Sequence, residues 1–189
     1  IRSLYVYSQL TLSIATQEAA YATNATPEKF WAKWQEKFTS DDEERNYKIK
    51  LQELKNKPLY ASVKEQLFTD RFKYVRQYFD ALEQEEILPT EQDNYLFGLC
   101  RPERLMDIVF NFVLFDNGDK KVARYQQFFA IKKSMQRIRN VEHGKRKGGV
   151  IWHTQGSGKS LTMVMLAQAI AMERSIRNPK IVLVTDRTD

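Results

Sequence analysis

Residues 152–163 read WHTQGSGKSLTM, the most informative segment in the second half of the chain. The last five positions of the phosphate-loop pattern G-x-x-x-x-G-K-[ST] are matched by Gly156-Ser157-Gly158-Lys159-Ser160. His153 stands where the pattern has its first glycine. Glycines let the backbone curl around phosphate oxygens, and a following helix adds a favourable dipole. The missing glycine lies at the end of the expected strand, where the constraint is weaker. The sequence therefore predicts a nucleotide-phosphate site.

The residues on both sides of this loop predict the context that such a site needs. VIW at 150–152 predicts a strand before it, and LTMVMLAQAIAME at 161–173 predicts a helix after it. IVLVTD at 181–186 is a β-branched run typical of a buried parallel strand. A further helix is expected over 123–139. The expected helices have buried faces formed by Leu161, Val164, Ala167 and Ile170 and by Tyr125, Phe128, Phe129 and Ile131. The order predicts an α/β unit with right-handed crossovers.

The first 118 residues are expected to be mostly helical after an initial strand. LYVYSQLTLSI at 4–14 has strand periodicity, and TPEKFWAKWQEKF at 26–38 predicts a helix capped by Thr26 with Pro27 at its first position. Further helical faces are expected over 60–84 and 105–112, and the charged stretch 39–50 is expected to be a loop or a helix start.

Turn residues around Gly118, in DNGDKK, mark the clearest break. We place a domain boundary there, with one domain at 1–118 and the other at 119–189.

Composition limits the class of protein. The 189 residues are 42% hydrophobic, so a packed core is expected, and the single cysteine fits a reducing compartment. No signal peptide or membrane-spanning run is found, which predicts a cytoplasmic protein. Residues 1–118 hold 15 Lys and Arg against 19 Asp and Glu, whereas residues 119–189 hold 15 against 5. The basic half would attract polyanions, although exposed helix faces also carry such charge.

Each polar residue of the loop has an expected role. Lys159 would reach the β- and γ-phosphates, and the Ser160 hydroxyl would ligate Mg²⁺. His153 is expected to be structural, and His143, in the basic stretch 140–149, to be solvated. Two histidines and one cysteine, widely spaced, form no metal-binding pattern.

The chain resembles a known family. GGVIWHTQGSGKSLTM at 148–163, preceded by ARYQQFFAIKKSMQRI and followed by IVLVTDRTD, is similar to the R (HsdR-type motor and endonuclease) subunit of type I restriction-modification enzymes. These subunits are superfamily 2 helicase-like translocases. The resemblance is specific over 122–189 and looser over 1–118. It implies the helical-rich end of a nuclease domain, with a strand at its start, followed by the beginning of a RecA-like P-loop motor domain.

The resemblance implies roles for particular residues. Gln127 would read adenine, with Arg124 and Tyr125 beside it, and the family's motif Ia would place Thr185, Arg187 and Thr188 on the DNA backbone. The ATP and Mg²⁺ site would comprise Thr154, Gln155, Gly156, Ser157, Gly158, Lys159 and Ser160. The implied partners are duplex DNA and the modification and specificity subunits, without a membrane.

The chain also departs from that family. No convincing nuclease motif of the form D…E-x-K is found, and the Walker B acid would lie after Asp189, so no catalytic residue is assigned and these residues alone are expected to turn over little ATP. Two alternatives stay open. One is a small P-loop kinase-like or GTPase-like enzyme with Asp186 as its Walker B acid, and the other is a basic scaffold whose loop holds a structural anion.

Overall fold

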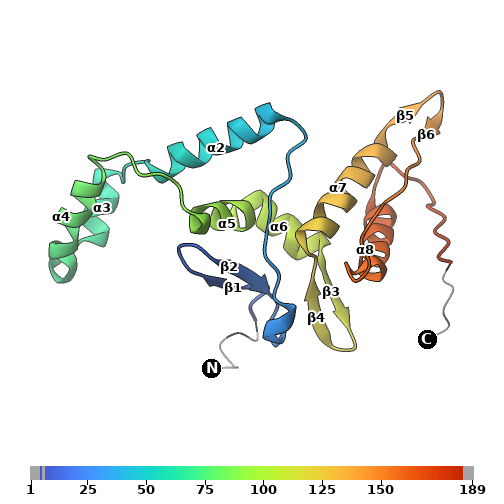
Figure 1. The fold of residues 1–189 in the computed structure, drawn as a ribbon, viewed down its shortest axis with the longest axis horizontal. Helices are drawn as coiled ribbons and strands as arrows, with labels where there is room; N and C mark the ends of the chain where they lie inside the picture. The colour runs from blue at the N-terminus through green and yellow to red at the C-terminus, as the bar shows by residue number, and fades with distance from the viewer. Residues whose placement is uncertain (1–4, 6, 185–189) are drawn as a thin grey trace. The chain divides into compact units, whose positions relative to one another are not determined.

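The computed structural model describes residue 5 and residues 7–184, which form two compact units (Figure 1). The first unit combines the chain up to Ser13, Ala20–Gln35 and the chain from Pro102 onward. The second combines Ile14–Ala19 and Glu36–Arg101. This division does not follow the boundary expected at residue 118. No helix among the described residues is long and apolar enough to cross a membrane.

The second unit is helical. It contains α2 (Asp41–Lys55), α3 (Ala61–Leu67), a 3-10 turn (Asp70–Phe72), α4 (Lys73–Leu82) and α5 (Glu91–Cys100). Helix α2 begins where Ser40 accepts a hydrogen bond from the Glu43 N–H, which confirms a helix start in the charged stretch 39–50. The helical face expected over 60–84 is divided among α3, the 3-10 turn and α4.

The first unit contains strands as well as helices. Its elements are η1 (Glu28–Phe30), α6 (Pro102–Asn111), β3 (Val113–Asp116), β4 (Asp119–Val122), α7 (Tyr125–Arg139), β5 (Val141–Glu142), β6 (Lys145–Arg146) and α8 (Lys159–Met172). Strands β1 (Thr11–Ile14) and β2 (Ala19–Ala22) pair with each other near the start of the chain. All three sheets in the described part have two strands.

The expected break at residues 116–121 is a tight hairpin. Strands β3 and β4 pair antiparallel, with Asp116 opposite Asp119. The turn residues Asn117 and Gly118 have φ values of 51° and 86°, as a two-residue hairpin turn requires. Turn chemistry was therefore identified correctly in the sequence, but the turn joins two neighbouring strands.

An aromatic cluster holds the first unit together. The Phe128 ring of α7 lies 5.4 Å from the Trp34 ring and 4.5 Å from the Phe112 ring, measured between centroids. The Arg104 guanidinium from α6 lies 4.7 Å from the Phe128 centroid and 5.1 Å from that of Trp34. Trp34, Phe112 and Phe128 are all at most 5% exposed. This cluster fixes α7 against α6 and against the segment that contains Trp34.

That segment corrects one expectation, because the helix predicted over 26–38 is wrong. Only the single turn η1 forms, and the backbone is extended at Trp31, with φ −61° and ψ 136°. Ala32 exchanges two backbone hydrogen bonds with Tyr21, of 2.8 and 2.9 Å. Pairing with the β2 strand and burial of Trp34 therefore override the local helical pattern.

The two strands expected on either side of the glycine loop do not form among the described residues. Residues 150–152 and 181–184 pair with no other strand among the described residues, and Val150, Trp152 and Val184 are 91, 89 and 85% exposed. A strand needs a hydrogen-bonded neighbour. The mixture of helix and strand fits the α/β class, but the expected parallel sheet is absent from this part of the chain.

Candidate functional site

The glycine loop adopts the curled backbone that its sequence predicts. Gly156 and Gly158 have φ values of 76° and 79°, in the left-handed region that glycine tolerates best. Ser157 closes the turn that begins at Thr154, because both its N–H and its hydroxyl donate to the Thr154 carbonyl, at 3.3 and 2.7 Å. Gly158 is the N-cap of α8, and Lys159 is its first residue. The predicted helix start is confirmed.

Gln127, in the first turn of α7, holds the loop through hydrogen bonds to its carbonyl groups. Its amide nitrogen donates to the carbonyl oxygens of Gly158 and Ser157, at 3.0 and 3.4 Å. Its amide oxygen accepts from the Arg124 N–H at 2.8 Å. Gln127 is only 1% exposed, and a Cβ atom built on Gly158 would lie 2.5 Å from the Gln127 amide nitrogen. A Cβ atom at position 158 would therefore displace the Gln127 amide, and the glutamine ties α7 to the loop.

Thr162 is a second support that the sequence reasoning missed. It is buried, and its hydroxyl and its N–H both donate to the Gly158 carbonyl, at 3.2 and 3.1 Å. A threonine hydroxyl that bonds four residues back in a helix is a common local pattern, so this contact had a recognisable signal. The face of α8 that is buried contains Thr162 and Met165, whereas Val164, expected on that face, is 47% exposed.

The loop presents groups suited to a phosphate. The first N–H groups of a helix have no partner within the helix, and the positive end of its dipole lies there. Lys159 and Ser160, at the start of α8, are exposed, and so are Thr154 and Gln155 before them. The Lys159 cation, the hydroxyls and the N–H groups around two left-handed glycines fit the triphosphate of ATP with its Mg²⁺.

Other predicted residues have varied positions. Arg124 is the exposed N-cap of α7, and Tyr125 is its half-buried first residue. His153 is half-buried, and its Nδ1 atom is buried without a hydrogen-bond partner among the described residues. Within that part of the chain, no cluster of three or more His, Cys, Asp or Glu side chains could hold a metal ion. Thr185, Arg187 and Thr188, predicted to contact DNA, lie outside the described residues together with Asp186.

Sequence comparisons show that the segment containing the glycine loop is similar to an ATPase family. Residues 126–189 match the SWI2/SNF2 ATPase family. The chain is 37% identical over 127 residues to the type I restriction enzyme HindI endonuclease subunit of Haemophilus influenzae, covering 64% of this chain and 11% of that protein. It is 35% identical over 105 residues to the putative type I restriction enzyme MjaIXP endonuclease subunit of Methanocaldococcus jannaschii, covering 53% of this chain and 10% of that protein.

The chain spans about a tenth of the length of these two curated relatives. No solved structure matches it. The chain is thus similar in sequence to type I restriction endonuclease subunits, and its residues 126–189 are similar to the SWI2/SNF2 ATPase family.

Proposed function

We propose that this chain, a relative of the endonuclease subunits of type I restriction enzymes, is part of a subunit that uses ATP hydrolysis to translocate duplex DNA and to cleave it away from the recognition site. The observation that carries the proposal is the glycine loop. It has two left-handed glycines, the N-terminus of α8 and a buried glutamine support, within a segment that matches an ATPase family. Residues 119–189 would belong to the first RecA-like motor domain, and residues 1–118 to the end of the nuclease domain.

Each residue of the loop has a role in this proposal. Lys159 would neutralise the β- and γ-phosphates, and Ser160 would hold Mg²⁺. The N–H groups that begin α8 would bind the phosphate oxygens, with Thr154 and Gln155 beside them. Bound MgATP would supply a transferable phosphoryl group. This chain's own contribution is to bind and orient that group, because the described residues include no acid assigned to activate water.

The exposed apolar segments have a place in the same proposal. Residues 150–152 and 181–184 would be strands of the motor domain's parallel sheet, in which their apolar side chains would be buried. Thr185, Arg187 and Thr188, directly after the second segment, would then contact DNA phosphates. The modification and specificity subunits would be partners, and the complex would act in the cytoplasm.

Measurement of ATPase activity tests this proposal. The full-length protein, assembled with its modification and specificity subunits, is assayed with and without duplex DNA. Strong stimulation by DNA is expected, and Lys159→Ala should abolish it. Lys133→Ala, which removes an exposed lysine from α7, is the matched control and should leave the rate unchanged.

Two other results would contradict the motor. An ATPase rate that is the same with and without DNA would favour a kinase-like enzyme in which Asp186 is the Walker B acid. An unchanged rate in Lys159→Ala would favour a scaffold whose loop holds only a structural anion.

A further inference from the structure

A basic surface lies in the first unit, at the ends of α7 and α8 that are far from the glycine loop. It consists of residues 137–147, which include the β5–β6 hairpin, and of the turn 173–177 that follows α8. We call these two segments together the hairpin surface. They hold seven Lys and Arg residues against two glutamates, which gives a net charge of +5. A surface with this balance attracts polyanions.

Arg146 of β6 connects the two segments. Its Nη1 atom donates to the Ile138 carbonyl at 3.0 Å, and its Nη2 atom donates to the Ser175 carbonyl at 2.6 Å. Arg139, at the end of α7, forms an ion pair with Glu173 at 2.6 Å. The hairpin and the turn are therefore held against each other, and their cations belong to one surface.

Both glutamates of the hairpin surface are already paired. Glu142 pairs with Lys147, and Glu173 pairs with Arg139. Hydrogen bonds from the Ser175 N–H and from Arg139 lower the pKa of Glu173, which therefore stays a carboxylate in its ion pair. Neither glutamate is left to neutralise the other cations of the surface.

Three of those cations have no partner in the described part of the chain. Lys145, Arg174 and Arg177 are exposed, and none of them forms an ion pair or a side-chain hydrogen bond with a described residue. A single unpaired cation is ordinary on a protein surface. Here three lie beside carboxylates that are already paired, so their positive charge is available to a ligand.

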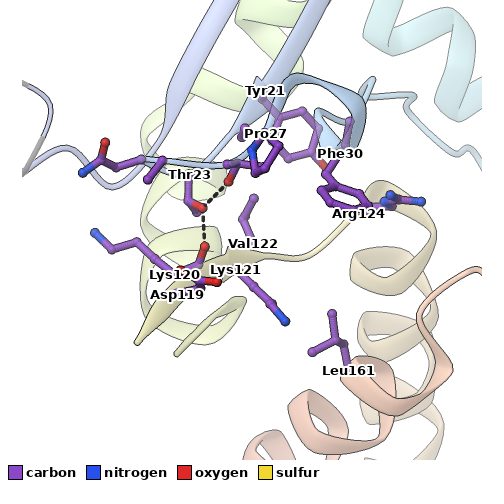
Figure 2. A pocket seen from close by; sticks show the side chains of 15 residues that line it. Tyr21, Thr23, Pro27, Phe30, Asp119, Lys120, Lys121, Val122, Arg124 and Leu161 are labelled. Carbon is purple, nitrogen blue, oxygen red and sulfur yellow. Dashed lines mark hydrogen bonds between the residues drawn. The ribbon is translucent and has the colours of Figure 1, made fainter. Parts of the chain in front are cut away.

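The charges around the pocket in Figure 2 are different. That pocket has a volume of about 400 Å³, and Asp119 lines it beside Lys120 and Lys121. Lys121 is in turn paired with Asp116. Positive charge is thus offset by nearby carboxylates at this pocket of the first unit, but not at the hairpin surface.

We propose that the hairpin surface binds the phosphate backbone of duplex DNA. The inference rests on the proposed function, because a DNA translocase makes duplex DNA the polyanion that such a surface meets. Duplex DNA carries about one negative charge per 1.7 Å of its axis, and guanidinium groups such as those of Arg174 and Arg177 match phosphate oxygens well. The contact adds to the one proposed for Thr185, Arg187 and Thr188. It is independent of base sequence and sensitive to salt.

Helix α8 separates this DNA contact from the glycine loop. The helix has 14 residues, so its two ends are about 20 Å apart. DNA phosphates at the hairpin surface therefore do not occupy the place of the ATP phosphates at Lys159. Loss of the DNA contact should leave nucleotide binding unchanged.

Binding of a fluorescent duplex of arbitrary sequence to the full-length protein tests the inference, with dissociation constants measured between about 50 and 200 mM salt. The test variant combines Lys145→Gln, Arg174→Gln and Arg177→Gln. Its dissociation constant should rise about tenfold or more, and the slope of log Kd against log salt should fall by about 3, which is about 1 for each lost phosphate contact. MgATP binding, measured in parallel, should not change.

Two further variants separate contact from charge. Lys33→Gln, Lys50→Gln and Lys73→Gln together remove the same charge from exposed positions elsewhere, and this matched control should keep the salt slope of the unmodified protein. Lys145→Arg, Arg174→Lys and Arg177→Lys together keep the charge of the hairpin surface and should keep its DNA binding.

The other outcomes would overturn the inference. An equal effect of the test variant and the matched control would show that only net charge matters. Weaker MgATP binding in the test variant would show that the change reaches the glycine loop. Normal DNA binding with weaker assembly onto the modification and specificity subunits would assign the surface to an acidic protein partner. If the unmodified protein binds no DNA, the proposed function itself is refuted, and this inference with it.

Discussion

Gln127→Glu is the sharpest perturbation that the structure offers, because it changes one donor atom without changing size. The amide oxygen that accepts from the Arg124 N–H at 2.8 Å is kept as a carboxylate oxygen. The amide nitrogen that donates to Gly158 and Ser157 becomes a second carboxylate oxygen facing two carbonyl oxygens. The site is 1% exposed, so water cannot screen this repulsion.

The magnitude has an upper limit set by protonation. A protonated glutamate has nearly the shape of glutamine, and its O–H can donate to the Gly158 carbonyl as the amide does. The folded state can therefore avoid the buried charge by protonating an ordinary carboxyl, which costs about 3.7 kcal/mol at pH 7. The lost hydrogen bonds and the unpaired buried charge together cost about 3 kcal/mol or more. We expect destabilisation of about 3 kcal/mol at pH 7.

The pH dependence follows from the same argument. Burial and the facing carbonyls would raise the folded-state pKa of the introduced carboxyl above its unfolded value. The penalty is then absent at pH values below the unfolded pKa and grows as the pH rises toward the folded pKa. The cost of protonating the carboxyl, which limits the destabilisation, falls to about 1 kcal/mol at pH 5, so the variant should recover most of its stability there.

Urea unfolding of Gln127→Glu at pH 7 and pH 5, each compared with the unmodified chain, measures the destabilisation at pH 7 and its decrease at pH 5. Gln126→Glu makes the same chemical change at the neighbouring exposed position, where a negative charge near a helix N-terminus is harmless. A Gln127→Glu penalty as small as that of Gln126→Glu, or one that does not shrink at pH 5, would refute the idea that this amide holds the loop.

Three further predictions concern other parts of the structure. Phe128→Ala should destabilise the first unit by about 3–5 kcal/mol in thermal unfolding, because it removes the ring that contacts Trp34 and Phe112; a cost below about 1 kcal/mol would contradict the cluster. Gly158→Ala should cost about 1–2 kcal/mol in backbone strain alone, because the φ value at position 158 is 79°. The new Cβ atom would also collide with the Gln127 amide, so the variant should bind inorganic tripolyphosphate more weakly. Unchanged tripolyphosphate binding would argue against the loop geometry. Asp93→Asn should cost the second unit about 1 kcal/mol at pH 7 in urea unfolding, with a smaller difference at pH 3. Burial alone would raise the pKa of Asp93, but hydrogen bonds from Thr90 and Lys55 lower it. The carboxylate therefore stabilises the folded state at pH values above its unfolded pKa, and this stabilisation is lost as the pH falls through its folded pKa. An equal difference in unfolding free energy at pH 7 and pH 3 would contradict this reasoning.

Local signals predicted what local physics controls. Helix α8 begins at Lys159 because two glycines end the loop, and α2 begins after Ser40 because its hydroxyl caps the helix. Phe128 and Ile131 recur at helical spacing and are both buried in α7. These features depend on residues within a few positions of each other, so a single sequence is sufficient to predict them.

Contacts between distant residues could not be predicted in the same way. Residues 26–38 have a good helical pattern, but Ala32 pairs with Tyr21 and Trp34 is buried against α7. The sequence identified Gln127 only through a family resemblance, and its bonds to the loop span about thirty positions. Tertiary contacts of this kind override propensity, and no local window contains them.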